Sequence, residues 1–297
     1  MKRAILLFIS FIAISQLNIS AEDIDYAGMI QPGKWLKNIT VKTEFMGESG
    51  TANIQIYFPR DYVKGKKLRT IIALHQSDKN ERDWESSGIE SFANKYNMVI
   101  VCPNMKRSVY EDSFYPETTY KWNVIPGSKF LGETLIKFLN KKFSLALKRD
   151  STGIMGIEAG AHGAILTPCY YPNRFKAAAG IAGYYDPPAI HEKYIKMIES
   201  IYGRYEDFKD RWENDANPLK LAERLKGVHI YLFHGLKWDS YQPEQSRVMA
   251  IKIKQLQKKS SDYSITYKEN KTGSKGWGYW RNQVPDVMAF MNENLSE

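Results

Sequence analysis

The sequence predicts an α/β protein whose central sheet is mostly parallel and is covered by helices on both faces. Short apolar segments of strand length alternate along the chain with longer segments that have the spacing of amphipathic helices. Several strand segments, such as residues 70–74 (TIIAL), are apolar throughout, as expected for strands buried on both sides. Residues 152–164 (TGIMGIEAGAHGA) pass from an apolar run into small residues, which is typical of a tight strand-to-helix turn.

The predicted strands are short segments rich in apolar and β-branched residues, bounded by glycine, proline or polar residues. The first two alternate between apolar and polar residues, as half-buried strands do, and are joined across residues 47–50. Strands are expected at residues 39–45, 53–58, 70–74, 98–102, 150–155, 175–181, 228–234 and 263–267.

The predicted helices carry apolar residues on one face at helical spacing. Between them lie a long loop at residues 104–127 and a loop rich in glycine and tryptophan at residues 273–280. Long loops in compact domains are often functional, and ligands of parallel sheets bind at the carboxyl ends of the strands. Helices are expected at residues 85–96, 128–143, 161–170, 218–226, 243–258 and 285–294, with an inserted helical segment at about 187–217.

The first 21 residues are typical of a secretory signal peptide. Lys2 and Arg3 precede an apolar run at residues 4–14, which is too short to span a bilayer as a mature helix. We therefore expect an exported protein, periplasmic or secreted, without a transmembrane helix in the mature chain. No repeat or low-complexity linker divides residues 22–297, so they are expected to form one domain.

The basic residues are scattered, although the formal net charge is +9. No basic motif with interleaved aromatic residues stands out, so nucleic acid is not an expected partner. The chain has two cysteines, Cys102 and Cys169. An oxidising compartment would allow a disulfide between them, but their predicted positions, at the end of a strand and within a helix, favour two buried thiols.

A series of short motifs occurs in a characteristic order between about residues 53 and 290. Together these motifs resemble the esterase-D-like branch of the α/β-hydrolases, which includes S-formylglutathione hydrolases, feruloyl and acetyl-xylan esterases and secreted mycolyltransferases. The resemblance implies the α/β-hydrolase fold and a nucleophile elbow. The motifs are Leu-His at 74–75, the glycine-rich turn at 156–164, YPNRF at 171–175, FHG at 233–235 with Asp239, and GWGYWR at 276–281.

The resemblance also assigns the positions of a catalytic triad, residue by residue. The nucleophilic serine of the family corresponds to Glu158, the acid to Asp239 and the histidine to Lys275. The oxyanion-loop positions correspond to Gln76, where the family has glycine, and to Ala159. The acid is therefore kept, whereas the nucleophile, the base and one loop glycine are changed.

A protonated lysine cannot replace the imidazole base of a triad, because the reference pKa of lysine is about 10.4. We expect Glu158 and Lys275 to form an ion pair, with Asp239 on the other side of the lysine, because a desolvated carboxylate needs a cationic partner. The resulting hypothesis is a pseudo-esterase that binds a small molecule, a glycan or a protein through the former cleft. The alternative is an active carboxylic-ester hydrolase with an unconventional nucleophile or one relocated to a loop serine, the candidates being Ser77, Ser240 and Ser274.

Several other side chains are candidates for lining the cleft. His75, Trp122, His162 and Trp238 follow predicted strands or lie in loops at the same edge of the sheet. Trp277 and Trp280 are instead expected to pack the last loop against the closing helix. The side chains that could supply metal ligands lack the spacing of a known metal motif, so neither a metal nor another cofactor is expected. They are His75, Glu158, His162, His234 and Asp239.

Overall fold

A computed structural model describes residues 24–118, 120–145, 147–237, 244–273 and 276–296. Its strands form one eight-stranded sheet in the order β1-β2-β4-β3-β5-β6-β7-β8. The hairpin β1 (Trp35–Phe45) and β2 (Glu48–Tyr57) is antiparallel, and β2 also pairs antiparallel with β4. The remaining strands are parallel, which confirms the predicted α/β class. They are β3 (Thr70–Leu74), β4 (Val99–Pro103), β5 (Thr152–Ile157), β6 (Ala177–Ile181), β7 (His229–Gly235) and β8 (Ser264–Asn270).

The first strand is longer than the sequence predicts, because a bulge interrupts its alternation. β1 begins at Trp35, and its pairing with β2 shifts register between Leu36 and Ile39. Asn38 lies within this shift and has a positive φ of 59°. A bulge displaces side chains from the two-residue period, so the regular pattern in the sequence is visible only from residue 39 onward.

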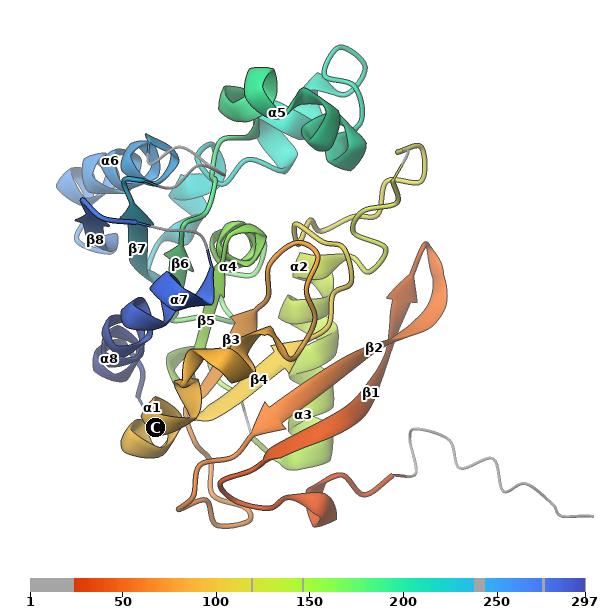
Figure 1. Ribbon diagram of the computed structural model, residues 1–297, viewed down its shortest axis with the longest axis vertical. Coiled ribbons are helices and arrows are strands. Elements are labelled where there is room, and N and C mark those ends of the chain that lie inside the picture. Colours follow the sequence, from red (N-terminus) through yellow and green to blue (C-terminus); the bar gives the residue numbers. More distant parts are fainter. Residues whose placement is uncertain (1–23, 119, 146, 238–243, 274–275, 297) are drawn as a thin grey trace, which may run out of the picture.

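Helices cover both faces of the sheet (Figure 1). On one face, α1 (Ile89–Tyr96) lies beside α8 (Val284–Asn294), and both contribute to a core that includes Ile71 and Ala73 of β3. On the other face, Ile72 and Leu74 of β3 belong to a second core. The helices of that face are α3 (Leu135–Phe143), α4 (Ala159–Tyr170) and α6 (Glu244–Lys259), with the 3₁₀ turn η6 (Leu221–Leu225).

Besides β1, several predicted segments differ in detail from the structure, and the helix expected at 218–226 is only the 3₁₀ turn η6 (Leu221–Leu225). The helix expected at 85–96 is a 3₁₀ turn, η2 (Asp83–Ser87), followed by α1, because Gly88 between them has a φ of +77°. The helix at 128–143 contains a π-helical turn, η3 (Phe130–Thr134), between α2 (Gly127–Lys129) and α3. The loop expected at 273–280 ends in the short helix α7 (Trp277–Trp280).

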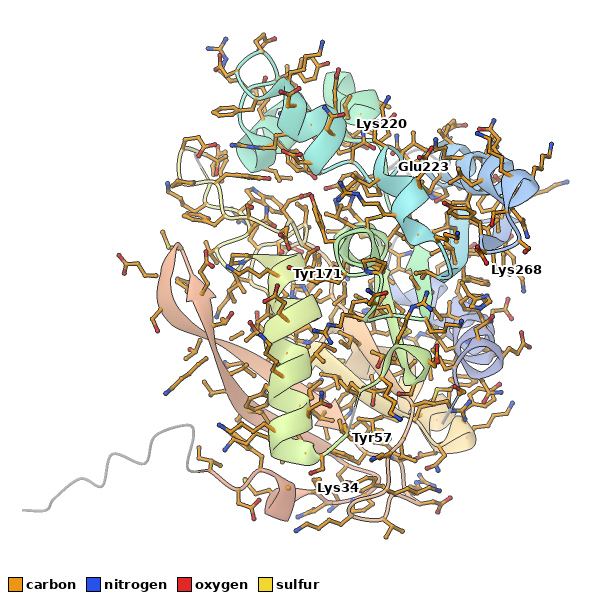
Figure 2. The ribbon with its side chains drawn as sticks, turned by 180° about the vertical axis from the view of Figure 1, so that it is seen from behind. Lys34, Tyr57, Tyr171, Lys220, Glu223 and Lys268 are labelled. Carbon is orange, nitrogen blue, oxygen red and sulfur yellow. The ribbon has the colours of Figure 1, made fainter. Side chains whose placement is uncertain are left out.

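The inserted helical segment stands at one end of the sheet (Figure 1). It consists of α5 (Pro187–Tyr202) and a π-helical turn, η5 (Arg211–Asp215), and we call residues 187–217 the cap. The long loop at 104–126 approaches the same end of the molecule (Figure 1). Tyr171, labelled in Figure 2, follows α4 and donates a hydrogen bond of 3.1 Å to Asp112 Oδ1 in that loop.

Both cysteines are free thiols in the interior, as the sequence predicts, and burial raises the pKa of each above its usual value. In the part of the chain that the structure describes, no helix combines the length and the apolar character needed to cross a bilayer.

Candidate active site

The turn between β5 and α4 has the backbone geometry of a nucleophile elbow. Glu158 occupies its central position with φ 55° and ψ −116°, a conformation that residues other than glycine rarely adopt. Its N–H donates to the carbonyl of Ile181 on β6 at 3.0 Å, and its carbonyl accepts the N–H groups of Ala161 and His162. The turn therefore holds one particular side chain, that of Glu158, at the carboxyl edge of the sheet.

Glycines flank Glu158 because the neighbouring backbones approach closely. A Cβ atom on Gly156 would lie 2.1 Å from the carbonyl oxygen of Gly160, and one on Gly160 would lie 2.5 Å from the carbonyl oxygen of Leu74. Neither contact is sterically possible without a backbone shift. The elbow thus packs directly against the end of β3, and the small residues in the sequence are a geometric requirement.

The surroundings of Glu158 are largely buried and contain tyrosines. Glu158 itself is 8% exposed. Burial raises the pKa of both Tyr110 and Tyr184 well above the usual value, and the charge of Glu158 contributes in the same direction. The predicted partners Asp239 and Lys275 lie outside the described residues, as do Trp238, Ser240 and Ser274, so the ion pair between Glu158 and Lys275 stays a prediction.

The oxyanion-loop residue Gln76 is tied to a carboxylate. Its backbone N–H donates to Asp83 Oδ2 at 3.1 Å, and its side-chain amide contacts both oxygens of Asp83 at 3.2 Å. Trp277 Nε1 donates to Asp83 Oδ1 at 2.8 Å. Asp83 therefore links the loop after β3 to the segment that follows Lys275, a role that no motif in the sequence indicates. The other oxyanion position, Ala159, is buried at the first residue of α4.

His75 is fully buried, and both of its ring nitrogens are occupied. Nε2 accepts the backbone N–H of Met105 at 2.9 Å, so Nε2 carries no proton. Nδ1 lies 2.5 Å from the carbonyl oxygen of Gln76 and must be the protonated nitrogen. Burial lowers the pKa of His75 below its usual value. His75 is thus neutral, and its hydrogen bonds connect the loop after β3 to the segment at Met105. Because it is fully buried, its side chain is not accessible to a ligand.

His162 belongs to a buried polar network that the sequence did not reveal. Its Nδ1 contacts the carbonyl oxygen of Tyr184 at 3.0 Å, and its Nε2 lies 3.1 Å from Glu111 Oε1. The same Glu111 oxygen accepts the hydroxyl of Tyr202 at 2.8 Å, and Tyr202 in turn lies 3.0 Å from the hydroxyl of Tyr184. Burial raises the pKa of Glu111. These residues come from four separate segments, so no sequence spacing connects them.

The other cleft candidates have mainly structural contacts. Trp122 is 9% exposed and belongs to the same buried cluster as Ile71 and Ala73 of β3, with the guanidinium of Arg107 5.5 Å from its ring centre. His234 is buried, with Nδ1 3.0 Å from Ser246 Oγ. Trp277 packs edge-on against Trp84 of η2 and against Trp280 of α7, at 4.9 and 6.0 Å between ring centres.

Metal-ligand side chains are dispersed in the described part of the chain. Within residues 24–296, apart from the undescribed gaps, no three His, Cys, Asp or Glu side chains come together as a set that could hold an ion.

Comparison with known proteins places this arrangement in a family. Residues 48–291 match the profile of the family described as "Putative esterase". The acetyl esterase of Caldicellulosiruptor saccharolyticus is 23% identical over 251 residues, which cover 80% of this chain and 87% of that protein.

Solved structures show the same fold at low sequence identity. The S-formylglutathione hydrolase of Agrobacterium tumefaciens superposes with a TM-score of 0.68 at 16% identity, over 86% of this chain and 94% of the hydrolase. Mycobacterium tuberculosis MPT51 (FbpC1) also has a TM-score of 0.68, at 14% identity, over 89% of this chain and 99% of that protein. With its strand order, its elbow and the family match over most of its length, the chain belongs to the esterase family of α/β-hydrolases, in the esterase-D-like branch that its motifs resemble.

Proposed function

We propose that this protein is a catalytically degenerate esterase that binds a ligand through the former active-site cleft. The observation that carries the proposal is the side chain at the centre of the elbow. The turn has the strained geometry that presents a nucleophile, but it presents the carboxylate of Glu158 instead of a hydroxyl. A serine esterase needs that hydroxyl to form and then release an acyl intermediate.

A carboxylate nucleophile would itself need a base to activate the water that releases the intermediate. The two histidines packed against the elbow do not suit this role. His75 uses both ring nitrogens in hydrogen bonds to the backbone, and His162 uses its nitrogens on Tyr184 and Glu111. Lys275 at the histidine position would stay protonated at neutral pH. These features support loss of hydrolysis, with binding of a small molecule, a glycan or a protein as the retained function.

The location we propose for this function is outside the cytoplasm. Lys2 and Arg3 followed by an apolar segment support cleavage of a signal peptide before Glu22. An exported esterase-like protein would meet extracellular or periplasmic ligands.

One observation favours the alternative, an active hydrolase with an unconventional nucleophile. Glu158 keeps a φ of 55°, although a glycine would adopt this conformation without strain. Strain at a central elbow residue is a feature of working active sites. Turnover measured on variants of Glu158 distinguishes a retained activity from a lost one.

The test is turnover of p-nitrophenyl acetate by the wild type, Glu158→Ala and the double variant Glu158→Ser/Lys275→His. We expect no turnover above buffer for the first two. The double variant should exceed them by about tenfold or more, because a positioned base contributes roughly 10²–10⁴-fold to such reactions. The double variant Glu158→Ser/Lys275→His should also become labelled by a fluorophosphonate, whereas the wild type should not. Wild-type turnover that Glu158→Ala abolishes would overturn the proposal, and labelling of a wild-type serine would relocate the active site.

A further inference from the structure

We infer a second binding site, outside the former active-site cleft, in a groove between the cap and the long loop, and we assign it to a neutral oligosaccharide. The groove has a volume of about 520 Å³, which lies within the range of about 300–1,000 Å³ typical of small-molecule sites. One wall comes from Glu117, Thr118 and Tyr120 of the loop and the other from α5 and residues 203–208. Figure 1 shows these two segments at the same end of the molecule. This inference does not depend on whether the elbow is active.

The two walls are joined by Arg211. Its Nη1 donates to Glu117 Oε1 of the loop at 2.7 Å and to the carbonyl oxygen of Tyr202 in α5 at 2.6 Å. The guanidinium also lies between two rings, 3.6 Å from the centre of Tyr115 in the loop and 4.2 Å from that of Phe208 in the cap. The Arg211 side chain is 16% exposed and the Glu117 side chain 38%, so the guanidinium is mostly buried while the carboxylate at the loop end stays accessible to water.

The link has a consequence for binding. Ordering flexible segments opposes association, and a site whose walls are already held in place avoids much of that free energy. The buried network on the other side of α5, in which Tyr202 donates to Glu111, holds the same helix to the same loop. The groove is therefore preorganised, which distinguishes it from an incidental hollow between two mobile surface segments.

The side chains along the groove indicate the class of ligand. Tyr120 is 60% exposed and lines the groove together with Phe208, one face of whose ring is covered by the Arg211 guanidinium, so Tyr120 is the ring most open to an apolar ligand surface. The charged side chains are of both signs, with three carboxylates and two cations. Such a mixture disfavours a highly charged ligand but offers many donors and acceptors to hydroxyl groups. The carboxylates belong to Glu117, Glu199 and Asp207, and the cations to Lys196 and Arg204.

A neutral sugar combines the two properties that this lining requires. The C–H groups on one face of a pyranose ring form an apolar surface that packs on an aromatic ring, while its hydroxyls both donate and accept hydrogen bonds. An acidic polysaccharide would meet the three carboxylates, and a purely apolar ligand would remove water from the charged groups without offering them hydrogen bonds of its own. A neutral oligosaccharide is therefore the class of ligand that the groove fits best.

The test is titration of the mature protein with neutral hexasaccharides of glucose, xylose and mannose at millimolar concentration, followed by calorimetry and by NMR chemical shifts. At least one of them should bind, and Tyr120→Ala and Asp207→Asn should each weaken binding by about three- to tenfold. Tyr120→Phe keeps the ring and should bind like the wild type. Asp210→Asn removes an exposed carboxylate of the same segment that does not line the groove, so it should leave the affinity unchanged.

Three results would overturn the inference. The first is no binding of any of these saccharides. The second is binding that Tyr120→Ala and Asp207→Asn leave intact but Glu158→Ala removes, which would place the ligand in the former cleft. The third is equal weakening by Asp210→Asn and Asp207→Asn, which would indicate a general charge effect. Because Tyr120, Asp207 and Asp210 are all exposed, circular dichroism and urea unfolding should show that the variants fold normally.

Discussion

At the scale of single residues, burial drives two ionisable side chains near the elbow towards their neutral forms. His75 and Glu111 are 0% and 1% exposed, and desolvation is the largest cause of the pKa shift of each. Because desolvation disfavours the charged form, it lowers the pKa of the histidine and raises that of the glutamate. The two residues lie behind the former active site and stabilise its loops through hydrogen bonds.

The lowered pKa of His75 predicts a pH dependence of stability. The unfolded chain binds a proton at this residue below a pH of about 6.5, whereas the folded protein does so only at a lower pH. Stability from the neutral His75 is therefore present above about pH 6.5 and is lost as the pH falls towards the folded pKa, by up to ~1.4 kcal/mol per pH unit. Urea unfolding of the wild type and of His75→Gln at several pH values measures the contribution of His75 to the free energy of unfolding.

The variant should show a shallower decrease of unfolding free energy with falling pH than the wild type. Equal slopes would mean that His75 doesn't titrate in this range. Burial and the charges of Lys176 and Arg149 also lower the pKa of His229. His229→Gln is therefore the matched control. It should remove only the contribution of His229 to the slope of unfolding free energy against pH. If His75→Gln does not fold, an NMR titration of the His75 ring in the wild type reports the same pKa directly.

At the scale of elements, the buried polar network joins the elbow helix to the cap. Through His162, Glu111 and Tyr202, it connects α4, the long loop and α5. The same loop and cap are joined a second time by Arg211. Polar contacts therefore join the elements around the former active site, in addition to the apolar cluster that the cap and the loop share with the sheet.

We expect Tyr202→Phe to destabilise the protein by about 1–3 kcal/mol, because Glu111 then loses a buried hydrogen-bond donor. The ring and its packing on Trp212, with 5.5 Å between ring centres, are kept. Tyr205→Phe is the matched control, since its hydroxyl bonds to Glu213 at a partly exposed site and should contribute little. Urea unfolding gives the free energies, and hydrogen exchange should show faster exchange in α5 for Tyr202→Phe alone. Equal losses for the two variants would argue against the network as the link.

At the scale of the whole molecule, stability comes from two apolar layers that sandwich the sheet. The closing helix α8 completes one of them with Val284, Val287, Met288 and Met291, all with no exposed surface. On the opposite side of the sheet, α6 buries Met249 and Ile253 but leaves Ile251 55% exposed. The last helix of the chain is therefore part of the core, and the fold depends on it.

Met288→Ala should lower the unfolding free energy by about 2–5 kcal/mol, since it removes a fully buried side chain and leaves a cavity. Ile251→Ala removes an aliphatic side chain of similar size from an exposed site and should change stability by less than about 0.5 kcal/mol. The difference between the two midpoints of urea unfolding checks this prediction. A loss below about 1 kcal/mol for Met288→Ala would show that α8 packs loosely on the sheet.

The sequence by itself determined the fold class and the position of the elbow. Both are local properties, because an apolar run of strand length and a turn of small residues are each formed by residues that are adjacent in the sequence. The segment 152–164 predicted the change from β5 to α4, and the structure confirms it at Glu158. Boundaries were less accurate where a local irregularity intervenes, as at the bulge of β1 and at Gly88.

Only the tertiary structure decided which polar side chains meet. Asp83 bonds to Gln76 and to Trp277, which is 194 residues away in the chain. Glu111 bonds to His162 across 51 residues and to Tyr202 across 91. Such contacts arise from the packing of separate elements, and a single sequence carries no periodic signal for them. For the same reason the sequence pointed to His75 and His162 as cleft residues, whereas the folded chain buries both.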